Sequence, residues 1–380
     1  MEYTLLKNIA VIMMGQSPSS SSYNEEGVGI PFYQGNADFG ELYPTARIWC
    51  NEPKKIANKN DILISVRAPI GALNYATEQC CIGRGLASIT VKDEVLRNYV
   101  FRLLKANRNK LINQGSGSTF KAIGKSNLEE LRIPIVDEMT QKKIMNLMDA
   151  TEQIIRQRQI ELQLFDDLIK ARFIELFGDP KINDKSWDIG IISDYYEVKG
   201  GKRIPKGMGY TDAITTHPYL RASDMKNGTI IDDDIHYIDD EVYEHIKRYI
   251  VNGGDVYLTN VGVNLGMAGV IPDKYDGANL TENAVKLVPK KHNTIDGIFL
   301  SHYINSRGIQ NYINERKMAV GVPKLAIFRI ETMPILLPPP KLQKLFADFV
   351  HQVDKSKAAV QKALDETQLL FDSLMQEYFG

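Results

Sequence analysis

Residues 137–180 read DEMTQKKIMNLMDATEQIIRQRQIELQLFDDLIKARFIELFGDP. Neither Gly nor Pro occurs between Asp137 and Phe177, and Gly178-Asp179-Pro180 then supplies a helix-stop signal. At 1.5 Å per residue, an uninterrupted helix here would extend about 50–60 Å, more than one globular core requires. The apolar residues recur at helical spacing and predict one stripe along this helix: Ile144, Leu147, Met148, Ile154, Ile155, Leu162, Phe165, Leu168, Ile169 and Leu176.

A second stretch of the same kind follows Pro338-Pro339-Pro340, because residues 341–379 again lack Gly and Pro. Its matching stripe consists of Phe346, Phe349, Val350, Val353, Val360, Leu364, Leu370, Phe371, Leu374 and Tyr378. We expect the two helices to pack against each other or against helices of a partner. Two unrelated surface helices are the simpler alternative.

The part of the chain before each helix is also repeated. Short matches follow one another in the same order, with an offset that grows as insertions accumulate in loops. The matched pairs are residues 5–9 with 191–195, Gly15 with Gly201, 30–33 with 217–220, 37–39 with 223–225, 60–65 with 254–259, Gly71 with Gly266, and 133–135 with 333–335. The ordered series predicts a duplicated unit.

Each copy combines strand and helix patterns. β-rich apolar runs bounded by Gly, Asn or Pro predict strands at 61–66 and 87–91, and at 255–259 and 284–288. Helical patterns follow near 96–112 and 298–316. The expected fold class is therefore α+β, with a globular part at 1–136, a helix at 137–180, a second globular part at 181–337 and a second helix at 338–380.

The composition is that of an ordinary globular protein, with 380 residues of which 43% are hydrophobic and 24% charged. The formal net charge of -1 argues against a histone-like nucleic-acid binder. It does not exclude a nucleic-acid binder whose basic residues cluster on one face. No apolar run is long enough to span a bilayer, and the first residues lack the order of a signal peptide, so we expect a cytoplasmic protein. Cys50, Cys80 and Cys81 match no zinc spacing and are expected to be buried thiols.

Patterns of known catalytic chemistry are missing from the sequence. It holds no His-x-x-x-His or Cys-x-x-Cys pair and no Asn-Pro-Pro-Tyr or Asp-Pro-Pro-Tyr motif of an amino-methyltransferase. Gly124-Lys125-Ser126 resembles the end of a phosphate-binding loop, but Thr119 stands where that loop needs glycine. We therefore expect no catalytic residues and no metal site, and a role in recognition or scaffolding.

These features together resemble the specificity (S) subunit of type I restriction-modification systems, over essentially the whole chain. The most similar stretches are residues 60–65, 128–134, 141–144, 166–180, 338–340 and 343–346. The first copy departs from the second at Asp137-Glu138-Met139, where the second has its three prolines. This departure bears on whether the two helices dock identically.

The resemblance implies a division of labour. Each globular part would be a target recognition domain that reads one half of a bipartite site in double-stranded DNA. The helices would pair as an antiparallel coiled coil, set the distance between the half-sites and dock two modification (M) subunits. The M subunits would carry S-adenosylmethionine and methylate adenine, and restriction (R) subunits would add translocation and cleavage driven by ATP and Mg. The chain itself would hold no cofactor.

The length of the helices fits such a spacing role. A helix of about 50 Å spans roughly 15 base pairs at 3.4 Å per step. The segment Leu164–Leu168 resembles Leu370–Leu374, and Gln141 to Phe165 is shorter by four residues than Gln343 to Phe371. This difference is close to one helical turn, so we expect the two helices to differ in length while keeping the same apolar face.

Base and phosphate contacts require Arg, Lys, Asn, Gln, Ser or Thr side chains on loops. In the first domain, the candidates for DNA binding are Gln34, Asn36, Arg67, Arg84, Ser116, Ser118, Thr119 and Lys121. In the second domain, they are Lys202, Arg203, Lys206, Arg221, Asn260, Asn264, Asn279, Thr281, Asn283 and Lys317.

The helices supply the candidates for subunit interfaces: Ile144, Met148, Ile155, Leu162, Phe165, Ile169, Phe346, Val350, Val353, Val360, Leu364 and Phe371. Two other functions remain open from the sequence. One is a coiled-coil adaptor that gathers proteins without touching DNA. The other is the DNA-reading part of a split restriction-methylation enzyme.

Overall fold

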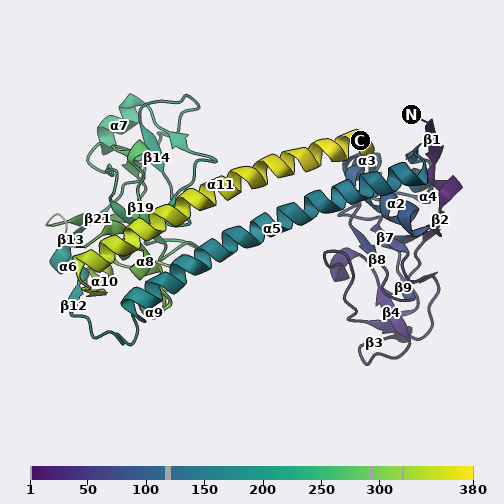
Figure 1. Ribbon diagram of the computed structural model, residues 1–380, viewed down its shortest axis with the longest axis horizontal. Coiled ribbons are helices and arrows are strands. Elements are labelled where there is room, and N and C mark those ends of the chain that lie inside the picture. Colours follow the sequence, from purple (N-terminus) through teal and green to yellow (C-terminus); the bar gives the residue numbers. More distant parts are fainter. Residues whose placement is uncertain (1, 116–120, 291–294, 319–320, 380) are drawn as a thin grey trace. The chain divides into compact units, whose positions relative to one another are not determined.

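The computed structural model describes residues 2–115, 121–290, 295–318 and 321–379. The chain divides into two compact units, Met1–Gln159 with Lys362–Gly380 (unit 1) and Ile160–Gln361 (unit 2). Each unit combines one globular part with a portion of each of two long helices. These helices are α5 (Glu138–Phe177) and α11 (Pro340–Phe379), as Figure 1 shows.

Local sequence signals set the ends of α5. The backbone N–H of Thr140 donates to Asp137 Oδ1 at 3.0 Å, which satisfies one of the free amides at the helix start. At the other end, Gly178 takes a φ of +78° and its N–H donates to the Ile174 carbonyl at 2.8 Å. A left-handed residue at this position favours glycine, so the predicted stop is confirmed.

The start of α11 repeats the start of α5. Gln343 Nε2 donates to the Pro338 carbonyl at 2.7 Å, and Gln141 Nε2 donates to the Val136 carbonyl at 2.9 Å. Pro340 is the first residue of α11, where a missing N–H costs nothing. The two glutamines are therefore equivalent positions of the repeat.

The predicted difference in helix length is wrong. Both helices contain 40 residues, and they begin and end at equivalent positions of the repeat. The shared Leu-Phe-Asp signature simply lies about one turn later in α11 than in α5. Its displacement therefore reflects local sequence and no change in length.

In unit 1, the beginning of α5 packs with the end of α11. Ile144, Met148 and Ile155 of α5 share one buried core with Phe371 and Leu374 of α11.

In unit 2, the end of α5 packs with the beginning of α11. Ile169 and Phe173 of α5 share a core with Phe346 and Val353 of α11. Lys357 Nζ also lies 2.5 Å from Asp166 Oδ1. Because the end of one helix meets the beginning of the other in both units, the pair is antiparallel, and it is consistent with the predicted coiled coil.

The globular part of unit 1 is built from antiparallel and mixed sheets (Figure 1). A four-stranded sheet has the order β2-β10-β7-β8, and one of its faces contributes to the same core as α2 and α5. A second sheet has the order β3-β5-β4-β9-β6, and β1 pairs with β11. The bounds are β1 (Glu2–Leu5), β2 (Val11–Met14), β3 (Tyr23–Asn24), β4 (Ile30–Tyr33), β5 (Trp49–Cys50), β6 (Ile56–Ala57), β7 (Ile62–Ser65), β8 (Leu73–Tyr75), β9 (Cys80–Ile82), β10 (Leu86–Thr90), α1 (Leu6–Ile9), α2 (Glu94–Ala106), α3 (Arg108–Gln114), α4 (Lys125–Glu129) and β11 (Arg132–Ile135).

Unit 2 repeats this arrangement with the order β13-β21-β18-β19 in its four-stranded sheet and β17-β14-β20 in a second sheet. The two smaller pairings are β12-β22 and β15-β16. The bounds are β12 (Ile189–Ile191), α6 (Ile192–Tyr195), β13 (Tyr196–Gly200), β14 (Pro218–Leu220), β15 (Met225–Lys226), β16 (Thr229–Ile230), β17 (His236–Tyr237), α7 (Asp240–Ile246), β18 (Val256–Thr259), β19 (Ala268–Val270), β20 (Asn279–Leu280), β21 (Ala284–Pro289), α8 (Gly297–Asn305), α9 (Arg307–Arg316), α10 (Ile327–Glu331) and β22 (Pro334–Leu336).

Hydrogen bonds confirm that the two globular parts repeat. The backbone N–H of Asn58 donates to Asp61 Oδ2 at 2.8 Å, and that of Asn252 donates to Asp255 Oδ2 at 2.9 Å. The parallel pairing of β4 with β9 recurs in the pairing of β14 with β20. Two equivalent α+β parts, as predicted, are therefore present.

One of the matched pairs has a different register from the predicted one. The N–H of Leu6 donates to the Leu131 carbonyl at 2.9 Å, and the N–H of Ile192 donates to the Met333 carbonyl at 3.0 Å. Leu131 is therefore the equivalent of Met333. Pro134 lies three residues after Leu131, whereas Pro334 lies one residue after Met333, so the two prolines are not equivalent positions.

The three cysteines are buried, as predicted. Burial raises the pKa of the Cys80 thiol to about 12 and that of Cys81 to about 11, so both stay protonated at neutral pH. Among the helices of the described residues, none combines the length and apolar character that crossing a bilayer requires.

Candidate nucleic-acid interface

In unit 2, loops at the strand ends are joined by backbone hydrogen bonds. The N–H of Gly201 donates to the Ala284 carbonyl at 3.1 Å, and the N–H of Lys202 donates to the Leu280 carbonyl at 2.8 Å. The loop after β13 is thereby fixed beside the turn between β20 and β21. Lys202 and Arg203 are exposed on this loop, and Lys206 is exposed farther along it.

The loop between β18 and β19 completes the cluster. The N–H of Asn260 donates to the Asn283 carbonyl at 3.0 Å, and the Asn260 carbonyl accepts from the N–H of Leu325 at 2.8 Å. Asn264, Asn283 and Lys317 are half-buried on these segments. The structure therefore gathers most candidates of the second domain on neighbouring loops, which we name the unit 2 loop cluster (residues 201–206, 260–266, 281–283 and 317–325 where described).

Three candidates of this domain do not face solvent. Asn260, Asn279 and Thr281 are only 5%, 0% and 4% exposed. The side chain of Asn279 donates to the Ile246 carbonyl at 3.0 Å. A base cannot reach these side chains in this conformation, so the predicted DNA contact is replaced by a role in holding the turns.

Arg221 is paired with an acidic residue of its own loop and with one of the loop between β16 and β17. Its Nη2 lies 2.7 Å from Asp224 Oδ1 and 3.0 Å from Asp234 Oδ2. The hydrogen bonds that Arg221 donates to Asp224 raise the pKa of Arg221, despite the opposing effect of burial. Arg221 is thus ion-paired within unit 2, and its assignment to DNA binding stays a prediction.

Unit 1 builds an equivalent cluster from the same backbone contacts. The N–H of Gly15 donates to the Leu86 carbonyl at 2.9 Å, and the N–H of Gln16 donates to the Ile82 carbonyl at 3.0 Å. The N–H of Val66 donates to the Gly85 carbonyl at 2.9 Å, as Asn260 does in unit 2. We name residues 15–17, 34–36, 66–71, 83–85 and 121–123 the unit 1 loop cluster.

The candidates of the first domain lie on this cluster where the structure describes them. Gln34, Arg67, Arg84 and Lys121 are exposed, and Asn36 is half-buried. The remaining candidates, Ser116, Ser118 and Thr119, lie outside the described residues.

Ser17 and Glu282 belong to the clusters but were not among the sequence candidates. Ser17 Oγ donates to Gln34 Oε1 at 3.0 Å, and Arg203 Nε donates to Glu282 Oε1 at 2.5 Å. Ser17 and Arg203 are equivalent positions, each two residues after the matched glycine. The match of Gly15 with Gly201 could have indicated Ser17, because Ser17 stands where the candidate Arg203 stands in the second copy. Glu282 could not be found in this way, because its turn is in none of the matched segments.

The candidate interface residues of the helices are inside this chain. Ile144, Met148, Ile155, Ile169, Phe346, Val350, Val353, Val360 and Phe371 are at most 9% exposed, and Leu162, Phe165 and Leu364 are half-buried. These side chains largely pack within the chain, and their assignment to contacts between subunits stays a prediction. The exposed apolar residues of α5 include Leu147, Ile154, Ile160, Leu164, Leu168 and Ile174. The single predicted stripe wrongly included Leu147, Ile154 and Leu168.

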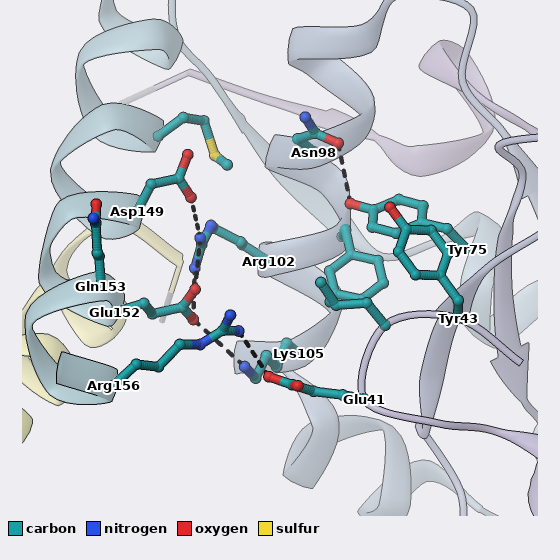
Figure 2. A pocket seen from close by; sticks show the side chains of 13 residues that line it. Glu41, Tyr43, Tyr75, Asn98, Arg102, Lys105, Asp149, Glu152, Gln153 and Arg156 are labelled. Atoms are coloured by element: carbon teal, nitrogen blue, oxygen red, sulfur yellow. Dashed lines mark hydrogen bonds and ion pairs between the residues drawn. The ribbon is translucent and has the colours of Figure 1, made fainter. Parts of the chain in front are cut away.

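A cavity of about 450 Å³ lies in unit 1 between α2 and α5 (Figure 2). Its charged groups neutralise one another: Arg102 Nη2 lies 2.5 Å from Asp149 Oδ1, and Arg102 Nη1 lies 3.0 Å from Glu152 Oε1. Arg156 Nη2 lies 2.7 Å from Glu41 Oε1 at the rim. The network joins the globular part to α5 and is structural. In the described part of the chain, no three His, Cys, Asp or Glu side chains gather as a metal site.

Two equivalent loop clusters and a pair of long antiparallel helices are the features that place this chain in a class of proteins. The family model for the type I restriction modification DNA specificity domain matches residues 1–164 and 184–367. The chain therefore belongs to this family, which the sequence resemblance had indicated.

Individual relatives are similar to this chain to different extents. It is 23% identical over 399 residues to the type I restriction enzyme MjaIX specificity subunit of Methanocaldococcus jannaschii, a match that covers 97% of this chain and 90% of that protein. It is 42% identical over 176 residues to the putative MjaX specificity subunit of the same organism, covering 46% of this chain but only 41% of that relative. The crystal structure of the type I S subunit from M. genitalium shares the fold, with a TM-score of 0.58, 16% identity and coverage of 100% of this chain and 96% of that one.

Proposed function

We propose that this chain is the non-catalytic DNA-specificity subunit of a type I restriction-modification enzyme. The observation that supports this function most strongly is the repetition of the loop cluster. In each unit, equivalent backbone hydrogen bonds hold the loop after the first strand of the four-stranded sheet, a β-turn and a hairpin side by side. Two copies of one surface suit a bipartite DNA site in which each unit reads one half.

The exposed and half-buried candidate side chains divide by chemistry into two groups. Lys121, Lys202, Lys206 and Lys317 suit phosphate contacts, which position a protein on DNA without reading its sequence. Gln34, Arg67, Arg84, Asn264 and Asn283 can hydrogen-bond base edges in the major groove. The antiparallel helices set the distance between the two half-sites.

The modification subunits dock on the exposed apolar side of the helices. In unit 2, Ile160, Leu164 and Leu168 follow one another at intervals of four residues and are 60%, 61% and 47% exposed. Residues at this spacing lie on one helix face, where large apolar side chains are unusual without a partner. The partners supply S-adenosylmethionine-dependent adenine methylation, and restriction subunits supply ATP- and Mg-dependent cleavage.

The test of this function is methylome sequencing of cells that carry the modification subunit with and without this chain. We expect adenine methylation at a bipartite word only when the chain is present. Methylation at the same word without the chain would contradict the proposal. A methylated word that is one continuous sequence, with no spacer, would also contradict it.

The docking surface is tested by the double substitution Leu164→Asp and Leu168→Asp. Because both side chains are exposed, the fold should persist while co-purification of the modification subunit is lost. Ile214→Asp is the matched control, since Ile214 is 85% exposed on a loop away from the helices. Equal loss of the partner in the control, or none in the double variant, would contradict this assignment.

A further inference from the structure

The same turn occupies the centre of both loop clusters. In unit 1, residues 83–85 join β9 to β10, and the N–H of Leu86 donates back to the Gly83 carbonyl at 3.0 Å. In unit 2, residues 281–283 join β20 to β21, and the N–H of Ala284 donates back to the Thr281 carbonyl at 3.3 Å. The residue at the tip of the turn is Arg84 in one unit and Glu282 in the other.

Each turn is fixed from two sides. On one side, Gly15 and Gly201 donate to the residue that follows the turn. On the other side, the hairpin loop donates to the last residue of the turn, Gly85 or Asn283. A tip residue on a backbone held in this way is preorganised, which is what the reading of one particular base requires.

A carboxylate at the tip in unit 2 needs an explanation. Burial would raise the pKa of Glu282, but the hydrogen bonds from Arg203 and the turn outweigh that effect and lower it, so the group is charged at neutral pH. Its neighbours on the cluster include Lys202 and Lys206 as well as Arg203. On a surface that only bound phosphates, a negative charge among these cations would lower the affinity for DNA.

Stability of the fold does not account for Glu282 either. In its ion pair with Arg203, the two side chains are 29% and 78% exposed. Pairs this open contribute little to folding, because water screens them. The Glu282 carboxylate also borders an open cavity of about 410 Å³, with Tyr210 and Asn283 among its walls. The cavity leaves room for the edge of a base.

We propose that the tip of this turn is a base-reading position whose chemistry is opposite in the two units. Glu282 accepts a hydrogen bond from an exocyclic amino group in the major groove, the N4 of cytosine or the N6 of adenine. Arg84 donates to the O6 and N7 acceptors of guanine. Arg203 orients the Glu282 carboxylate and shields it from the phosphates. This inference rests on the proposed function, since it assumes that each unit reads one half-site.

The experiment compares the words methylated by the holoenzyme with wild-type chain, Glu282→Gln, Arg84→Gln and the control Glu197→Gln. Glu197 is also acidic, exposed and paired with a lysine, Lys199, at 2.9 Å, but it lies on β13 outside the cluster. We expect Glu282→Gln to relax one position of one half-site by roughly 5- to 150-fold, Arg84→Gln to relax one guanine of the other half-site, and the control to leave the word unchanged.

Duplexes with a base that lacks the amino group identify the group that Glu282 reads. Purine replaces adenine, or 2-pyrimidinone replaces cytosine, at the relaxed position. The wild-type complex should lose affinity for one of these duplexes, and the loss should be smaller for the Glu282→Gln complex, because an amide oxygen is a weaker acceptor than a carboxylate. The other half-site, read by unit 1, must keep its word in the Glu282 variant, which shows that the variant is folded.

Two failures are distinguishable. If the wild-type chain directs methylation to a bipartite word and Glu282→Gln leaves every position of that word unchanged, the base-reading role is overturned while the proposed function stands. If the wild-type chain directs no such word, the proposed function itself fails.

Discussion

At the scale of single residues, Arg102 joins the globular part of unit 1 to α5 by two ion pairs. Its side chain is 10% exposed and meets Asp149 and Glu152, which are 62% and 26% exposed (Figure 2). Arg156 and Glu41 form a second pair at the rim of the same cavity, with 56% and 78% exposure. The two pairs share their chemistry and differ in burial.

We therefore predict that Arg102→Met lowers the free energy of unfolding by about 2–3 kcal/mol, because Glu152 is left half-buried with only the more distant Lys105 Nζ, 3.7 Å away, as its paired counter-charge. Arg156→Met should cost no more than about 1 kcal/mol, because water screens an exposed pair. Chemical denaturation of both variants measures the difference. Equal losses would show that burial does not govern this network.

The same network predicts a pH dependence. Burial alone would raise the pKa of Glu152, but the hydrogen bonds and charge of Arg102 outweigh it, so the pKa lies below its usual value of 4.5. A carboxyl with a lowered folded-state pKa stabilises the protein above its unfolded pKa and loses that contribution as pH falls through the folded value. The stability difference between the wild-type chain and Glu152→Gln should therefore shrink as pH falls from about 6 to about 3. A difference that stays constant would contradict the assignment.

At the scale of elements, the long helices contribute to the cores of both units, and aromatic side chains concentrate where they do so. Phe346 of α11 is fully buried, with its ring centroid 5.5 Å from those of Phe173 and Phe177 of α5. Leu345, the neighbouring residue, is 47% exposed. Adjacent positions of one helix thus have opposite environments.

We predict that Phe346→Ala lowers the free energy of unfolding by about 3–5 kcal/mol, because it removes buried contacts and leaves a cavity. Leu345→Ala should change it by less than about 1 kcal/mol, because its side chain is largely in water. Thermal and chemical unfolding of the two variants provide the comparison. A large loss for Leu345→Ala alone would mean that the apolar face of α11 has been misassigned.

At the scale of the whole molecule, the boundary between the compact units crosses the two helices at equivalent positions of the repeat, after Gln159 in α5 and after Gln361 in α11. A coiled-coil insertion of seven residues restores nearly the same apolar face, whereas two residues rotate it by about 200°. Under the proposed function, the boundary is therefore the place to change the distance between half-sites.

We predict that inserting seven residues at both positions lengthens the spacer of the methylated word by about three base pairs, since seven residues add about 10 Å. Inserting two residues at both positions should abolish the assembled enzyme, because the apolar faces then point apart. Methylome sequencing measures the spacer. An unchanged spacer in the seven-residue variant would show that the helices do not set it.

The sequence by itself determined the repetition and the helices, because both depend on local signals. The spacing of apolar residues, the stop at Gly178 and the ordered matches between the halves can all be read along the chain. Three of its candidate cations, Arg84, Lys202 and Arg203, are exposed on loops of the structure. The match of the family model to residues 1–164 and 184–367 agrees with the repetition.

Only the tertiary structure decided what each polar or apolar side chain faces. Asn279 and Asn283 have the same side chain and lie only four positions apart, yet one is buried against the Ile246 carbonyl and the other lies on the loop cluster. Leu147 and Met148 likewise divide between water and the core. Burial depends on contacts between segments far apart in the chain, such as the return of α11 to the start of α5, and a one-residue step changes the face. The same long-range contacts placed Glu282 beside Arg203, a pairing 79 residues apart that no local pattern contained.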